Sequence, residues 1–155
     1  MENRIKGKIA IVTGATSGIG WASAIELAKL GADIIISGRR QERLDALGKE
    51  LDALGVKHYP LIMDVSKSAD VKEKMASLPD EWKDIDILIN NAGMAVGTEK
   101  VFESEMEDYD VVIDTNVKGV LYMIKAVVPQ MVKRNAKGVG LAEYKFNGWN
   151  TCIGS

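Results

Sequence analysis

A glycine-rich turn near the N-terminus constrains the fold of this chain more than any other feature. Gly14, Gly18 and Gly20 follow a short apolar run at 8–13 and lead into a helical pattern at 19–30. Glycines between a strand and a helix permit a tight turn, and they let the backbone N–H groups at the helix start approach a phosphate. The spacing is G-x-x-x-G-x-G, and a purely structural glycine turn is the alternative. The strand before it and the helix after it favour phosphate binding.

The rest of the chain continues to alternate strand and helix patterns. We predict further strands at 33–37, 59–63 and 84–89, and further helices at 41–54, 66–78, 104–112 and 116–132. Ser66 is the expected N-cap of the helix at 66–78. Strands that are apolar on both faces and separated by helices are typical of a parallel sheet covered on both sides. The sequence therefore predicts an α/β fold, an open doubly wound and mostly parallel sheet with helices on both faces. A ligand crevice is expected at the carboxyl ends of its strands.

Composition excludes several classes of protein. Of the 155 residues 46% are hydrophobic, which is too many for a disordered chain, and no apolar run is long enough for a membrane helix. The 20 basic and 22 acidic residues are mixed along the chain, so no nucleic-acid partner is expected. Cys152 and His58 stand alone and cannot form a zinc site. The N-terminus shows no signal segment, and we expect a cytoplasmic protein that forms one domain over residues 1–155.

Two arginines follow the predicted second strand and refine the expected ligand. NAD-binding folds usually place an acidic residue there, about 20 residues after the glycines, to bond the ribose 2′-hydroxyl. This chain instead reads Ser37-Gly38-Arg39-Arg40. Guanidinium groups suit a 2′-phosphate, which a carboxylate would repel, so the sequence favours NADP over NAD. The alternative is that Arg39 and Arg40 only begin a solvated helix.

A second motif carries a resemblance to a known family. Asn90-Asn91-Ala92-Gly93 follows the run at 84–89, and together with the glycine turn it resembles the short-chain dehydrogenase/reductase family. The resemblance covers about residues 6–135 and implies a Rossmann fold. Within the family the chain is most similar to NADP-dependent 3-hydroxy acid dehydrogenases that act on serine and allo-threonine. That similarity rests on residues 38–44, 77–82 and 128–135.

The resemblance also implies a role for each matching residue. Arg39 and Arg40 would contact the 2′-phosphate, Asp64 with Val65 would receive the adenine, and Asn116 would bend its helix and hold a water in a proton relay. For Asn116 the alternative is an ordinary helix-terminal residue. The residues implied to hold the pyrophosphate are Gly14, Ala15, Thr16, Ser17, Gly18, Ile19 and Gly20. Those implied to line the ribose are Asn91, Ala92 and Gly93.

The catalytic Tyr-x-x-x-Lys pair of this family does not occur in the 155 residues. The tail at 136–155 diverges from the family, and Ser155 either matches the catalytic serine that ends the fifth strand or resembles it by chance. We therefore expect a C-terminally truncated NADP-dependent oxidoreductase that transfers hydride to or from a small hydroxy acid or alcohol and is inactive as this chain alone. A non-catalytic NADP-binding module or an inactive product is the alternative. The resemblance also implies that a homo-oligomer can form through the helices at 104–135.

Overall fold

Four parallel strands form the central sheet of the computed structural model, which describes residues 4–96, 100, 102–134, 142–146 and 149–153. Their order in the sheet is β3-β2-β1-β4, and the neighbouring strands pair in parallel. The strands are β1 (Ile9–Val12), β2 (Asp33–Gly38), β3 (His58–Ile62) and β4 (Ile87–Ile89). The predicted parallel sheet is confirmed, although β4 is shorter than the predicted 84–89.

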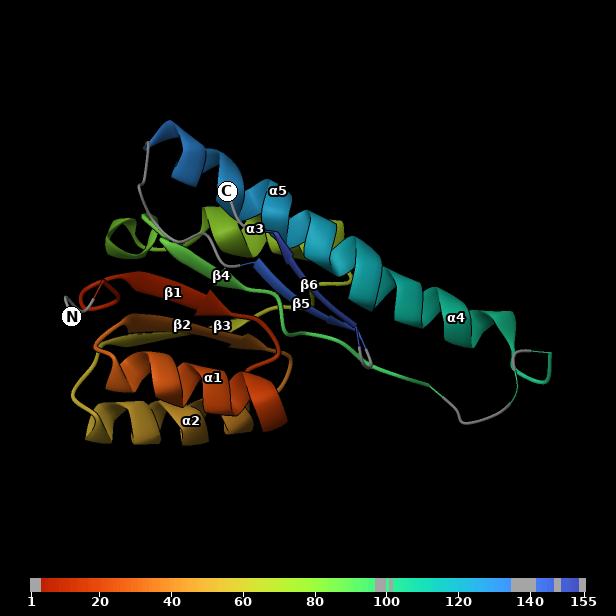
Figure 1. Ribbon diagram of the computed structural model, residues 1–155, viewed down its shortest axis with the longest axis horizontal. Coiled ribbons are helices and arrows are strands. Elements are labelled where there is room, and N and C mark those ends of the chain that lie inside the picture. Colours follow the sequence, from red (N-terminus) through yellow and green to blue (C-terminus); the bar gives the residue numbers. More distant parts are fainter. Residues whose placement is uncertain (1–3, 97–99, 101, 135–141, 147–148, 154–155) are drawn as a thin grey trace.

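Helices cover both faces of this sheet, as the alternating pattern predicts (Figure 1). One face is covered by α1 (Gly18–Lys29) and α2 (Gln41–Ala53). The other is covered by α3 (Ser68–Ala76), a 3-10 turn η1 (Asp80–Trp82) and α5 (Gly119–Lys133). The expected N-cap Ser66 is wrong, because Lys67 precedes the first helical residue of α3 and the Ser66 hydroxyl instead bonds Asp64.

Alternating side chains of the strands divide the core into two layers. Ile34 and Ile36 of β2 face α1 and α2, where they join Leu47. Ile35, between them, faces the opposite layer, where it joins Met123 of α5. All three isoleucines are fully buried, and burial of one such side chain stabilises the fold by about 1.5–3 kcal/mol. This two-sided burial explains why the strands read as continuous apolar runs.

The two helices predicted at 104–112 and 116–132 form a continuous helical segment. It begins with α4 (Met106–Ile113), passes through the π-helical turn η2 (Asp114–Lys118) and continues as α5. Figure 1 shows α4 extending away from the sheet, and none of its residues is buried. A π-helical turn inserts an extra residue into the helix and often occurs at functional sites.

The tail contains two further strands that do not join the parallel sheet. β5 (Ala142–Phe146) and β6 (Trp149–Ile153) pair antiparallel in a separate two-stranded sheet. β6, which ends two residues before Ser155, therefore pairs with β5 and not with the parallel sheet, and Ser155 itself lies outside the described residues. Among the residues that the structure describes, no helix is both long and apolar enough to span a membrane.

Candidate functional site

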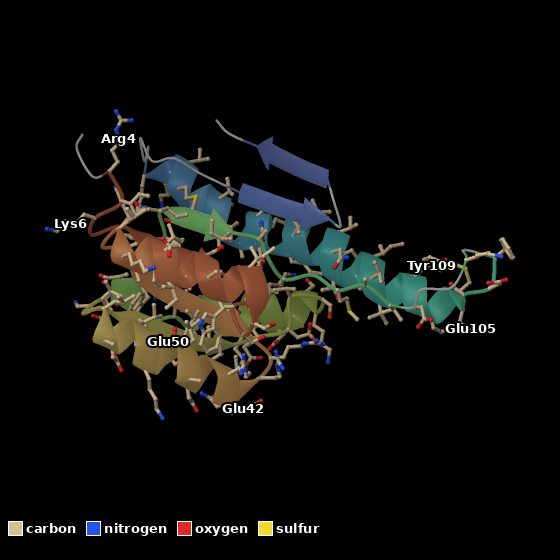
Figure 2. All side chains as sticks on the ribbon, turned by 60° about the horizontal axis from the view of Figure 1, so that its bottom comes forward. Arg4, Lys6, Glu42, Glu50, Glu105 and Tyr109 are labelled. Carbon is tan, nitrogen blue, oxygen red and sulfur yellow. The ribbon has the colours of Figure 1, made fainter. Side chains whose placement is uncertain are left out.

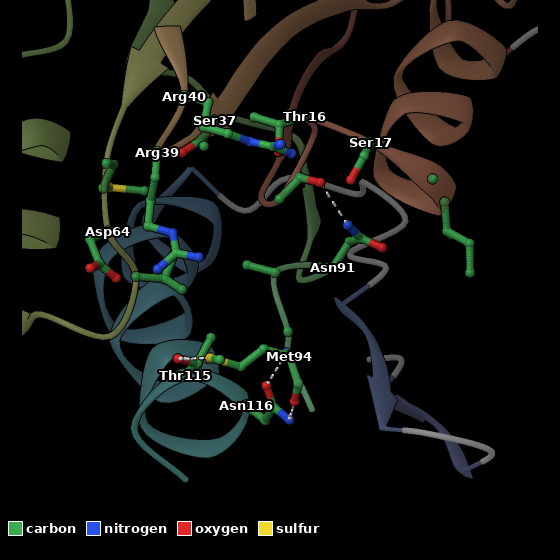
Figure 3. Close-up of a pocket in the computed structure, with 18 of the residues that line it drawn as sticks. Thr16, Ser17, Ser37, Arg39, Arg40, Asp64, Asn91, Met94, Thr115 and Asn116 are labelled. Atoms are coloured by element: carbon green, nitrogen blue, oxygen red, sulfur yellow. Dashed lines mark hydrogen bonds between the residues drawn. The ribbon is translucent and has the colours of Figure 1, made fainter. Parts of the chain in front are cut away.

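A pocket of about 820 Å³ lies at the carboxyl ends of the parallel strands (Figure 3). It is bordered by the glycine turn after β1, the arginine segment after β2, the residues after β3 and β4, and the turn η2. All predicted cofactor-binding residues except Ala15 and Gly20 line it, as does Asn116. The fold thus brings together residues that are up to about a hundred positions apart in sequence.

Ala15 and Gly20 lie behind the pocket and shape the turn. Ala15 is fully buried, and its N–H donates to the Ser37 carbonyl at 2.9 Å. A Cβ on Gly20 would collide with the Gly14 carbonyl and the Asn91 amide. A Cβ on Gly14, whose φ is +64°, would lie 2.7 Å from the Ala92 Cα. Close backbone packing therefore requires glycine at both positions.

Gly18, the first residue of α1, faces open space. Gly18 has a φ of +55°, and an added Cβ would meet no protein atom within 4 Å. The N-cap residue Ser17 is extended and makes no side-chain capping hydrogen bond. The first N–H groups of a helix have no partner inside the helix, and the helix dipole is positive there. This end of α1 can therefore receive an anion at close range, and the residues fit a pyrophosphate.

Asn91 and Thr13 tie the end of β4 to the glycine turn. The Asn91 side-chain amide donates to the carbonyls of Thr13 and Gly14, each at 3.1 Å. The Thr13 hydroxyl accepts from the N–H groups of Asn91 and Ala92 at 3.1 and 3.0 Å. Asn91 therefore stabilises the glycine turn through its side chain, and it also lines the pocket.

The two predicted arginines differ in their contacts. Arg40 donates from Nη2 to the Thr16 hydroxyl at 3.1 Å, so its guanidinium is anchored to the turn. Arg39 is exposed and, like Asp64, extends into the pocket (Figure 3). Its positive charge acts on the Asp64 carboxylate. Arg39 is therefore better placed than Arg40 to meet a ligand phosphate.

Asp64 is held as a carboxylate by its neighbours. Burial raises its pKa, but hydrogen bonds from the Ser66 hydroxyl and N–H, with the charges of Arg39 and Lys67, bring the pKa below its ordinary value of 3.8. Both bonds from Ser66 reach Oδ1, at 2.7 and 3.0 Å. Asp64 is therefore an ionised hydrogen-bond acceptor at neutral pH.

Asn116 clamps the chain that follows β4. Its Oδ1 accepts from the Met94 N–H at 2.8 Å, and its Nδ2 donates to the Met94 carbonyl at 2.7 Å. Its buried position within η2 agrees with the expected distortion of the helix. The side-chain amide is occupied by the backbone, so a water relay at this residue stays a prediction.

Further residues line the pocket that the motifs do not include. They are Ser37, Gly38, Met63, Met94, Ala95 and Thr115. Ser37, Gly38 and Met63 lie at or directly after the end of a strand, so the rule that ligands bind at the carboxyl ends of parallel strands could have found them. Thr115 is different, because the turn η2 carries it to the pocket, where its hydroxyl lies 3.6 Å from the Met94 sulfur.

Comparisons with known proteins agree with this arrangement. The family model for short chain dehydrogenases matches residues 8–139. The NADP-dependent 3-hydroxy acid dehydrogenase YdfG of Escherichia coli K12 is 47% identical over 127 residues, which are 82% of this chain and 50% of that protein. The serine 3-dehydrogenase of Rhizobium radiobacter is 37% identical over 149 residues, which are 94% of this chain and 59% of that protein.

A solved structure of a related enzyme has the same fold over the matched residues. The closed form of serine dehydrogenase complexed with NADP+ superposes with a TM-score of 0.76 at 47% identity, over 82% of this chain and 50% of that one. This chain spans about half the length of the curated relatives it matches. Because the family model covers most of the sequence and the fold agrees, the chain belongs to the short-chain dehydrogenase family.

Proposed function

We propose that residues 1–155 form one NADP(H)-binding domain and provide the cofactor-binding part of an NADP-dependent oxidoreductase. The reaction would transfer hydride between NADP(H) and a small hydroxy acid or alcohol. One observation carries the proposal: the open start of α1 and the exposed guanidinium of Arg39 border the same pocket. A dinucleotide with a 2′-phosphate offers anionic groups to both places.

The preference for NADP over NAD rests on the end of β2. Arg39 and Arg40 occupy the position where an acidic residue would bond the ribose 2′-hydroxyl. Arg40 is bound to Thr16, so we assign the 2′-phosphate chiefly to Arg39. The names of the relatives support this choice, because YdfG is called NADP-dependent and the serine dehydrogenase structure contains NADP+.

The division of chemistry follows from the residues present. When bound, the nicotinamide of NADPH supplies the hydride. This chain would bind the pyrophosphate at the start of α1, accept a hydrogen bond at Asp64 and keep the segment after β4 in place through Asn116. The 155 residues contain no Tyr-x-x-x-Lys pair, in which the tyrosine would donate the proton and the lysine would lower the pKa of that tyrosine. We therefore propose that it binds the cofactor without turnover.

Titration with NADPH and NADH tests the proposal. Wild-type chain should enhance NADPH fluorescence on binding. Arg39→Ala should weaken NADPH binding by about tenfold, the lower end of what a charged hydrogen bond is worth, and leave NADH binding unchanged. Arg4→Ala is the matched control, because Arg4 is exposed near the N-terminus and points away from the molecule (Figure 2). Equal losses for both nucleotides in Arg39→Ala would refute the assignment.

An activity assay tests the expected absence of turnover. If the chain were a complete catalyst, serine or a related hydroxy acid would reduce NADP+ above a protein-free blank. We expect no such rate while NADPH binding is measurable. A rate that grows with protein concentration would show that a group other than the family pair accepts the hydroxyl proton here. Binding without turnover also agrees with a non-catalytic NADP-binding module.

We also propose that a second copy of the chain covers α4 and the start of α5. Val111, Ile113 and Leu121 are each about half exposed, and α4 has no buried residue. Large apolar side chains left exposed on one helical segment favour association there. Sedimentation should show a dimer or larger, and Leu121→Glu should shift it toward the monomer. A cytoplasmic location remains a prediction from the sequence.

A further inference from the structure

We infer that Arg43 is a positioning residue for the nucleotide, which holds the glycine turn in its binding shape without lining the pocket. This inference rests on the proposed NADP(H) binding. Arg43 lies in the first turn of α2, and its Nε donates to the Thr16 carbonyl at 3.0 Å. Thr16 does line the pocket, whereas Arg43 is not among the residues that border it. Arg43 therefore acts on a ligand through Thr16.

Thr16 connects the glycine turn to the segment that runs from the end of β2 into α2. Arg43 binds its carbonyl, and Arg40 binds its hydroxyl at 3.1 Å. Its methyl group sits where a Cβ of Gly38 would be, so only glycine at position 38 leaves room for it. Contacts from main chain, hydroxyl and methyl fix Thr16 to one segment. A displacement of that segment must therefore displace the turn.

Arg43 also contacts α1, through the ring of Trp21. Its guanidinium carbon lies 5.0 Å from the centroid of the Trp21 ring, within the range of a cation–π contact. The Trp21 indole N–H donates to the Glu50 carboxylate of α2 at 3.3 Å. The planar guanidinium can stack on the indole and donate to a carbonyl at once, which an ammonium group does less well. The contacts of Arg43 thus join α2, α1 and the turn that precedes α1.

This geometry predicts a particular pattern of affinity. Loss of Arg43 should loosen the glycine turn that binds the pyrophosphate. NADPH and NADH both contain this pyrophosphate. Both nucleotides should lose affinity by a similar factor, and the ratio of their dissociation constants should stay constant. Loss of Arg39 should change that ratio instead, because only NADPH has the 2′-phosphate. The two arginines are thus distinguishable in one set of titrations.

The test is a titration of NADPH and NADH on wild type, Arg43→Ala, Arg43→Lys and Lys49→Ala, well below each melting temperature. We expect about five- to tenfold weaker binding of both nucleotides in Arg43→Ala, which is the contribution of one typical hydrogen bond. Arg43→Lys should recover part of the loss, because it keeps the charge and one donor. Lys49→Ala, which removes an exposed positive charge from the same helix, should bind as wild type does.

Three results would overturn the inference. Unchanged affinity in Arg43→Ala would show that the link to Thr16 does not set the binding shape. A selective loss for NADPH would make Arg43 a direct phosphate contact. Failure of the wild-type chain to bind either nucleotide would refute the proposed function and this inference with it. If Arg43→Ala does not fold, Trp21→Phe replaces it, with an expected loss of about two- to threefold for both nucleotides, and unchanged affinity there has the same meaning.

Discussion

Three glycines with positive φ make a matched series that tests how the turn is built. Gly55 follows α2 with a φ of +73° and would place a Cβ in open space. Gly14 has a similar φ of +64° but would place its Cβ 2.7 Å from the Ala92 Cα. Gly18, with a φ of +55°, would place its Cβ in open space beside the pocket. Substitution of each by Ala separates three physical effects.

The expected magnitudes follow from these geometries. A left-handed backbone costs an L-residue about 1–2 kcal/mol, so Gly55→Ala should lower the free energy of unfolding by that amount. Gly14→Ala adds a collision with main chain, which costs about another 1–3 kcal/mol. For a chain of this size, each kcal/mol lowers Tm by about 2–4 °C. Gly14→Ala should therefore melt several degrees below Gly55→Ala.

Urea and thermal unfolding measure the stability of the three variants, and NADPH titration measures their affinity. Gly18→Ala should be as stable as Gly55→Ala but bind NADPH at least about tenfold more weakly, because its new methyl group stands where a phosphate must approach the backbone. Equal stability of Gly14→Ala and Gly55→Ala would refute the close approach of the turn to Ala92. Unchanged NADPH affinity in Gly18→Ala would refute the phosphate assignment.

Two further predictions concern single polar side chains. Asn116→Asp keeps the shape of the side chain but cannot donate to the Met94 carbonyl, so urea unfolding should show a loss of about 2–3 kcal/mol, and a loss below about 0.5 kcal/mol would contradict the clamp. Asp64 has a folded-state pKa below its ordinary value of 3.8, so its stabilising contribution is present above that pH and is lost as pH falls through the folded pKa. The difference in free energy of unfolding between wild type and Asp64→Asn should therefore shrink below about pH 3.8 and stay constant from pH 5 to 7. If that difference is the same at pH 3 and pH 6, the Ser66 hydrogen bonds do not favour the carboxylate.

The parallel sheet could be predicted from the sequence because its signals are local. Runs such as residues 33–37 are apolar on both faces, and Gly31 and Gly55 end the helices before the next strand. The start of α3 was predicted wrongly, because Ser66 has two competing uses. Its hydroxyl could cap a helix, but it bonds the Asp64 carboxylate, while Asp70 accepts the Asp64 N–H at 2.7 Å.

The join between α4 and α5 could not be predicted from periodicity. The turn η2 has no hydrophobic signature of its own, and its stability comes from long-range contacts of Asn116 with Met94. The same limit applies to Arg43, whose position in the sequence suggests an ordinary charged residue on a helix. Its contact with Thr16 exists only once α1 and α2 lie side by side on the sheet.

We propose above all that this chain binds NADP(H) in the pocket at the carboxyl ends of its strands and selects it through Arg39. The most direct measurement is the ratio of the NADH and NADPH dissociation constants, for wild type and Arg39→Asp, under identical salt. We predict that wild type prefers NADPH by about tenfold or more and that Arg39→Asp abolishes or reverses this preference, because a carboxylate repels the 2′-phosphate. Equal affinities in wild type, or a preference that survives Arg39→Asp, would contradict the account.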